Sequence, residues 1–136
     1  MFTSTDTLTK YYQCLMGHFA MLIIIIFDQT DHLEAGVVGG VPVTEESKIG
    51  FTVCLVLTMI GIVIEAASLA VELPGIPRSL YCTVSHTTAT FLILLFIFDS
   101  HPPSHFWVLL ATLSVIPCLL ALIVIVQKLS NTQKQE

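Results

Sequence analysis

Four long apolar runs restrict what this chain can fold into. They cover about residues 8–27, 49–73, 80–98 and 105–126. A bilayer core about 30 Å thick is crossed by a helix of about 20 apolar residues, and each run has about that length. The runs therefore predict an all-α fold, an integral membrane four-helix bundle.

Composition supports this assignment and limits the domain count. The 136 residues are 54% hydrophobic and only 11% charged, whereas soluble domains carry about 25% charged residues. Four spans use most of the chain, so residues 1–136 are expected to form one domain, with a short polar tail at 127–136. The net charge of −5 does not suggest nucleic-acid binding.

Breaks between the runs predict three turns and a topology. The longest, Asp28–Lys48, is acidic and contains several glycines, whereas Pro74–Pro77 and Asp99–Ser104 are short. Basic residues near helix ends favour the cytoplasmic side. Only Lys48 falls on one side of a four-span hairpin arrangement, and the other side holds Lys10, Arg78, Lys128 and Lys134. Both termini are therefore expected in the cytoplasm, and the long loop outside or in the lumen.

Small and polar residues form a helix-packing seam along the second run. Their spacings of four, three, four, three and four follow a heptad repeat, and the members are Cys54, Thr58, Gly61, Glu65, Ser68 and Glu72. Membrane helices associate through such surfaces, because small side chains let backbones approach and polar ones bond across. The seam predicts which face of this helix meets the others.

Three ionisable residues share one depth within the predicted bundle. At a rise of 1.5 Å per residue, Glu65 lies roughly 12 Å from the cytoplasmic end of its helix, His86 roughly 9 Å and His18 roughly 10–15 Å. A buried carboxylate in a bilayer is costly and survives facing a bundle interior, a partner or water. A Glu65–His86 or a Glu65–His18 pair would reduce that cost.

This polar layer has two interpretations. One is a hydrogen-bonded clasp that fixes helix register, and the other is proton or ion handling. A transport path needs polar residues across the full thickness of the membrane, but the outer halves of the last two runs, at Phe91–Phe98 and Phe106–Leu110, are almost wholly apolar. The clasp is therefore favoured.

No other motif indicates catalysis or a cofactor. His101 and His105, near Asp99, could bind a metal, but an interfacial role is favoured and there is neither an HExxH nor a CxxC motif. Neither a metal nor a cofactor is expected, and the chain is not expected to be an enzyme. Tyr11 and Trp107 are interpreted as parts of two aromatic belts, together with Tyr12 and Phe106.

The four cysteines lie in apolar runs and are interpreted as small buried hydrophobes rather than a disulfide framework. Two of them, Cys14 and Cys82, lie near helix ends, where palmitoylation is an open alternative.

An ordered set of these features resembles the transmembrane protein 107 family. The resemblance spans nearly the whole chain, and the matching features are His18, Pro42–Glu46, Gly61, Glu65, His86, Thr87–Thr90, Phe96–Asp99, Trp107 and Ser114–Pro117.

The resemblance implies a non-enzymatic membrane scaffold at the ciliary transition zone. Such a protein supports assembly of the Meckel-syndrome module, ciliogenesis and control of ciliary membrane protein composition. Its partners would be the lipid bilayer and other transition-zone membrane proteins of that module, with no nucleic acid and no small-molecule substrate. The alternative is a small membrane transporter or membrane enzyme that uses Glu65 as its proton carrier.

Overall fold

The computed structural model describes residues 4–35, 43–99 and 104–133, and its regular elements are helical throughout. In chain order they are α1 (Ser4–Phe27), α2 (Gln29–Ala35), α3 (Glu45–Val71), α4 (Ile76–Asp99), α5 (Ser104–Leu109), the π-helical segment η1 (Leu110–Ser114) and α6 (Val115–Gln133). Four spans are long and apolar enough to cross a membrane by length and composition: α1, α3, α4 and the continuous α5–η1–α6. The prediction of an all-α four-span membrane protein is confirmed.

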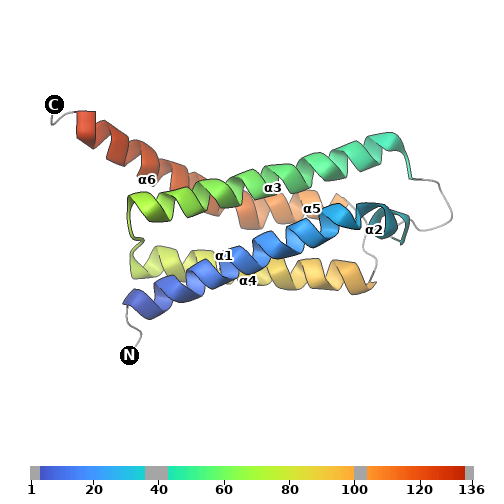
Figure 1. Ribbon diagram of the computed structural model, residues 1–136, viewed down its shortest axis with the longest axis horizontal. Coiled ribbons are helices and arrows are strands. Elements are labelled where there is room, and N and C mark those ends of the chain that lie inside the picture. The colour runs from blue at the N-terminus through green and yellow to red at the C-terminus, as the bar shows by residue number, and fades with distance from the viewer. Residues whose placement is uncertain (1–3, 36–42, 100–103, 134–136) are drawn as a thin grey trace.

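The spans alternate in direction and pack as two main pairs. The largest contacts join α1 to α4 and α3 to α6, and α1 also packs on α3. Figure 1 shows that α1 begins and α6 ends at the same end of the bundle. This arrangement agrees with an even number of crossings, whereas the cytoplasmic placement of that end stays a prediction.

Helix α3 begins earlier than its apolar run. The Thr44 hydroxyl accepts a hydrogen bond from the Ser47 backbone N–H at 3.2 Å, and it caps the first turn. Glu45 and Glu46 follow, where acidic groups favour a helix N-terminus. The helix ends at Val71 because Glu72 is extended and Pro74 follows.

The predicted loop at 28–48 is partly helical. Its first part forms α2, whose Leu33 is fully buried, and Thr52 of α3 donates a hydrogen bond to Gln29 at 2.9 Å. The middle of that loop, 36–42, lies outside the described residues. The predicted polar tail was also placed too early, because α6 continues to Gln133 and polar residues extend a helix without difficulty once it has formed.

The fourth span departs from regular α-helix in its outer half. In η1 the Val115 N–H bonds to the Leu110 carbonyl, five residues back. Pro117 explains the irregularity, since proline has no N–H and its ring crowds the carbonyl four residues earlier. Beyond this point α6 diverges from α1 and α4 and packs on α3, and its last turns also leave α3 (Figure 1). The predicted fourth span at 105–126 is therefore present as one continuous helical segment that contains a π-helical turn.

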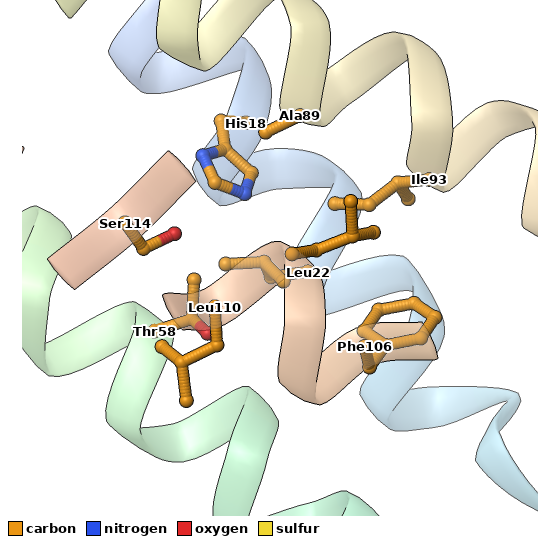
Figure 2. Close-up of a pocket in the computed structure, with 9 residues that line it drawn as sticks. His18, Leu22, Thr58, Ala89, Ile93, Phe106, Leu110 and Ser114 are labelled. Atoms are coloured by element: carbon orange, nitrogen blue, oxygen red, sulfur yellow. The ribbon is translucent and has the colours of Figure 1, made fainter. Parts of the chain in front are cut away.

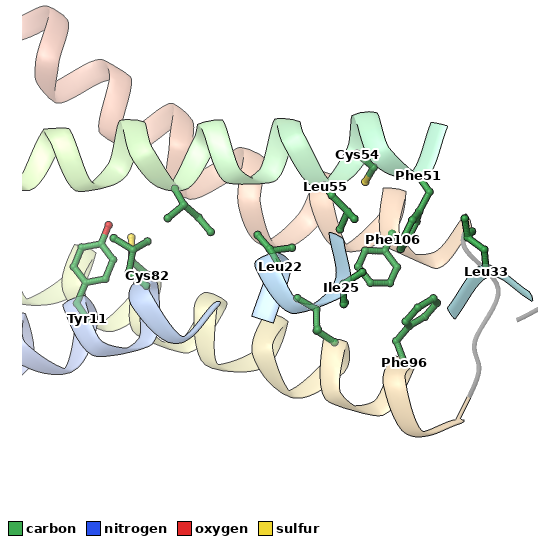
Figure 3. Close-up of a cluster of buried hydrophobic side chains, with 13 residues drawn as sticks. Tyr11, Leu22, Ile25, Leu33, Phe51, Cys54, Leu55, Cys82, Phe96 and Phe106 are labelled. Atoms are coloured by element: carbon green, nitrogen blue, oxygen red, sulfur yellow. The ribbon is translucent and has the colours of Figure 1, made fainter. Parts of the chain in front are cut away.

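An aromatic cluster fills the end of the bundle near α2. Phe106 meets Phe51 edge-to-face at a ring-centroid distance of 4.8 Å and Phe96 at 4.5 Å. Leu33 lies beside these rings (Figure 3). Phe106 is 4% exposed, so the sequence-based placement of this residue in an interfacial belt was wrong, whereas Trp107 is 44% exposed. The cluster closes this end of the bundle with apolar atoms.

Candidate functional site

Glu65 of α3 is the centre of a polar site inside the bundle. Its side chain is fully buried, and its Oε2 accepts a hydrogen bond from the Tyr11 hydroxyl of α1 at 3.0 Å. The Nε2 of His86, on α4, lies 2.8 Å from the same oxygen. One carboxylate therefore contacts two other spans.

His18 of α1 extends this site. Its Nδ1 lies 3.0 Å from the Nδ1 of His86, and both imidazoles are buried. The rings of Tyr11 and His86 are stacked at 6.1 Å, with an interplanar angle of 16°. We call the four residues Tyr11, His18, Glu65 and His86 the polar row. The sequence left open which histidine meets Glu65. In the structure His86 contacts Glu65, and His18 contacts His86.

Proton positions in the polar row follow from its acceptors. When His86 Nε2 donates, the one Glu65 oxygen accepts two hydrogen bonds, the other from the Tyr11 hydroxyl. His86 then accepts at Nδ1, so His18 donates from its own Nδ1. When His86 Nε2 instead accepts, the bond between the histidines is reversed, and His18 then carries its proton on Nε2. The polar row therefore has two consistent directions of hydrogen bonding.

A second chain of hydrogen bonds continues toward the end of α3. Arg78 Nη2 donates to the Ser68 hydroxyl at 2.8 Å, and this hydroxyl donates to the Glu65 carbonyl at 2.8 Å. Arg78 lies in the first turn of α4, so the contact closes the turn between the two helices. Two buried atoms in this region, Glu65 Oε1 and Arg78 Nε, make no hydrogen bond to the described residues.

The predicted seam on α3 is buried except at its last member. Buried positions are Cys54, Thr58, Gly61, Glu65 and Ser68. A Cβ on Gly61 would lie 3.7 Å from the Cβ of Cys118, so the seam faces α6 at this point. Glu72 is exposed and extended beyond the helix end, so its inclusion was wrong. The heptad spacing assumes a helix that continues, but α3 has ended by Glu72.

Tyr11 is the residue of the polar row that the sequence interpretation missed. It was assigned to an interfacial belt, but it is fully buried, whereas Tyr12 is 53% exposed. One signal was available: Tyr11 precedes His18 by seven residues, and residues two turns apart share a helix face. Arg78 was used only as a topology marker, and its bond to Ser68 depends on a tight turn that spacing does not show.

The remaining candidates are distributed as follows. All four cysteines are unpaired thiols, and Cys82 is fully buried, whereas Cys14 is partly exposed and its sulfur accepts from Thr87 at 3.2 Å. Among the described residues, no group of three or more His, Cys, Asp or Glu is placed to hold a metal ion. His101 of the considered metal site lies outside them.

Comparison with known protein families identifies a match over most of the chain. A family model named TMEM107, described as a transmembrane protein, matches residues 7–125. Neither the curated proteins nor the solved structures contain a match to the chain. The matched segment includes the whole polar row, all of α3 and α4, and most of the first and fourth spans. The chain belongs to the TMEM107 family of transmembrane proteins.

Proposed function

We propose that this protein is a non-enzymatic membrane scaffold of the ciliary transition zone. It would support assembly of the Meckel-syndrome module, ciliogenesis and control of ciliary membrane protein composition. Family membership supports a membrane protein, and the ciliary setting is what the resemblance to that family implies. The observation that carries the scaffold role is the polar row, because Glu65 links side chains of three different spans.

A structural role accounts for the geometry of the polar row. Its four side chains are at most 2% exposed, and each is bonded to another member of the row. Polar side chains that bond across membrane helices fix their register. A slip of α4 by one turn, about 5.4 Å, would break the bonds of His86 to both Glu65 and His18. The row thus selects one arrangement of α1, α3 and α4.

The aromatic cluster also favours a clasp over a carrier. Phe51, Phe96 and Phe106 close the bundle on one side of the polar row, with ring centroids 4.5–6.0 Å apart. A proton carrier in a membrane needs access from both faces in turn. Opening such access would require these three rings, held on three spans, to separate.

The outer surface of the bundle suits lipids and partner helices. Apolar side chains of α3 that point away from the core include Val53, Val56, Ile60 and Val63, each between 43% and 58% exposed. We propose the lipid bilayer and other transition-zone membrane proteins as the occupants of such faces. We further propose that both termini are cytoplasmic.

The second candidate function is a small transporter or membrane enzyme with Glu65 as its proton carrier. A row of titratable groups, from Glu65 through His86 to His18, is the observation that favours it. Proton relays in membrane proteins are built from such acid and histidine chains. This function needs a group at position 65 that gains and loses a proton.

Replacement of Glu65 separates the two candidates. Cells that lack the protein would receive wild type, Glu65→Gln or Glu65→Leu. Glu72→Gln is the matched control, because it changes an exposed acid just beyond the end of α3. The readout is the localisation of other membrane proteins at the transition zone. A clasp needs a hydrogen-bonding group, so Gln should rescue partner localisation better than Leu.

Two outcomes would reject parts of this proposal. If Glu65→Gln reaches the transition zone at the wild-type level but rescues as poorly as Leu, the titratable acid is required and the carrier function is favoured. If the wild-type protein does not concentrate at the transition zone, or its loss leaves the other membrane proteins in place, the scaffold function there is wrong.

A further inference from the structure

We propose that a small cavity beside His18 binds one structural water molecule, which extends the polar row to the fourth span. The cavity has a volume of about 10 Å³ and lies between α1, α3, α4 and η1. Three of its lining residues are polar: His18, Thr58 and Ser114. Figure 2 shows the His18 ring directed into this space, with Thr58 and Ser114 opposite.

The remaining ring nitrogen of His18 requires a partner. Nδ1 is engaged with His86, which leaves Nε2 for the cavity. His18 is only 2% exposed, and a buried polar atom without a hydrogen bond is costly. When His18 donates from Nδ1, Nε2 is an acceptor. When the histidine bond is reversed, Nε2 carries the proton and is a donor. A partner that both donates and accepts satisfies the two states.

Water matches the size and the chemistry of this cavity. One water needs about 10–15 Å³ of such space and two to four polar partners. Thr58 donates its hydroxyl proton to the Cys54 carbonyl at 2.8 Å, so its oxygen remains able to accept. The Ser114 hydroxyl can donate or accept. His18 Nε2, Thr58 Oγ1 and Ser114 Oγ therefore supply three partners for one water.

A metal cation fits this cavity less well. Calcium and magnesium require six or more oxygen ligands, usually with carboxylates among them. The lining offers two hydroxyls and one imidazole, and the other lining side chains are apolar, among them Leu22, Ile93 and Phe106.

The π-helical segment explains how Ser114 comes to line the cavity. Ser114 is the last residue of η1 and is 4% exposed. A π-helical turn rotates the residues that follow it relative to a regular α-helix, and such turns occur mostly at functional sites. The irregularity before Pro117 thus places a hydroxyl against α1 and α3. The water would then link the fourth span to the clasp that holds the other three.

Water-edited solid-state NMR on the full-length protein in lipid bilayers tests this site directly. The protein would carry ¹⁵N-labelled histidine, and magnetisation would be transferred from water to the ring nitrogens. We expect rapid transfer to His18 Nε2. The His86 ring is the internal control, because both its nitrogens face protein groups, Glu65 and His18. Transfer to His18 no faster than to His86 would overturn the proposal, whatever any variant does.

Two variants of η1 then locate the water. Ser114→Val fills the cavity and should abolish transfer to His18. Thr112→Ala is the matched control, because the Thr112 hydroxyl is exposed and bonds within its own span to the Val108 carbonyl at 2.7 Å. This variant should retain the wild-type transfer. A folded Ser114→Val protein with undiminished transfer to His18 would place the water elsewhere and reject the site. If Ser114→Val does not fold, the wild-type comparison of the two histidines decides.

Discussion

Removing the Tyr11 hydroxyl tests the polar row with a single-atom change. Tyr11→Phe keeps the buried ring and deletes the donor that lies 3.0 Å from Glu65 Oε2. Hydrogen bonds between membrane helices contribute about 0.6 kcal/mol on average and up to about 1.7. Hydrogen bonds to charged groups contribute about 1.5–3 kcal/mol. Because Glu65 keeps its contact with His86 after the change, we expect a loss of about 1–2 kcal/mol in the free energy of unfolding.

The neighbouring tyrosine provides a matched control. Tyr12 is 53% exposed, so Tyr12→Phe should change stability by less than about 0.5 kcal/mol. Reversible unfolding by added SDS in lipid–detergent micelles, followed by helical circular dichroism, measures both variants under one condition. Equal stability of the two variants would refute the assignment of Tyr11 to the polar row. In a Glu65→Gln background, Tyr11→Phe should lose a different amount, since contacting residues couple by about 0.5–3 kcal/mol.

Three further predictions test other parts of the bundle. A Cβ on Gly61 would meet Cys118 at ordinary contact distances of 3.7 and 3.8 Å, so Gly61→Ala should raise stability by about 0.5–1 kcal/mol through its higher helix propensity. Gly61→Leu should separate α3 from α6 and destabilise more than the volume-conserving Ile62→Leu, by about 1–3 kcal/mol in the same SDS assay; equal losses would contradict the packing of α3 on α6. Leu33→Ala should cost about 2–3 kcal/mol and expose α2 to protease, whereas Glu34→Ala, at an exposed neighbour, should not; unchanged proteolysis of α2 would contradict its docking. Single cysteines at Glu34 and Ser130, in a background without reactive native thiols, should label from opposite sides of the membrane with an impermeant reagent; labelling from one side would reject the topology.

The number of spans could be predicted from the sequence, but their ends could not. An apolar run predicts which residues lie in the hydrocarbon core. It does not predict where a helix ends outside the membrane. Helix α3 starts at Glu45, four residues before the predicted run, because Thr44 caps a polar first turn. Helix α6 continues to Gln133, past the end of its apolar run, because polar residues extend a helix that has already formed.

The members of the polar row were partly predictable because burial of an ionisable group in a membrane requires a compensating partner. Glu65, His86 and His18 were identified by depth alone. Depth does not fix rotation about the helix axis, so the order of contacts, Glu65 to His86 to His18, required the structure. Tyr11 was missed because a tyrosine at a helix end equally suits an interfacial belt.

The π-helical segment could not be predicted from the hydrophobic periodicity of the sequence. Pro117 predicts some disturbance of the fourth span, but a proline is accommodated by a kink, a broken helix or a widened turn. Which of these occurs depends on the packing partners. Here the widened turn keeps Ser114 and Pro117 buried while Val115 and Ile116 between them face outward.

The direct polar contacts distinguish one span from the other three, because the fourth span would join the polar row only through the proposed water. Register among α1, α3 and α4 is fixed by short bonds at 2.8–3.0 Å within the polar row. The hydroxyls of Thr112 and Thr132 in the fourth span bond to carbonyls of that same span, and α6 meets α3 through the close approach of Gly61 and Cys118. Helices in contact through small residues can slide or tilt at low cost. Helices joined by a buried ionisable group move at higher cost, because that group would lose its partner.

We therefore expect a partner helix that reshapes this bundle to displace α6 before it separates α1 from α4. Accessibility of a cysteine at Leu119, on α6, should then change upon partner binding, whereas accessibility at Val84, on α4, should not. The opposite pattern would show that the polar row does not determine the order in which a partner displaces the spans.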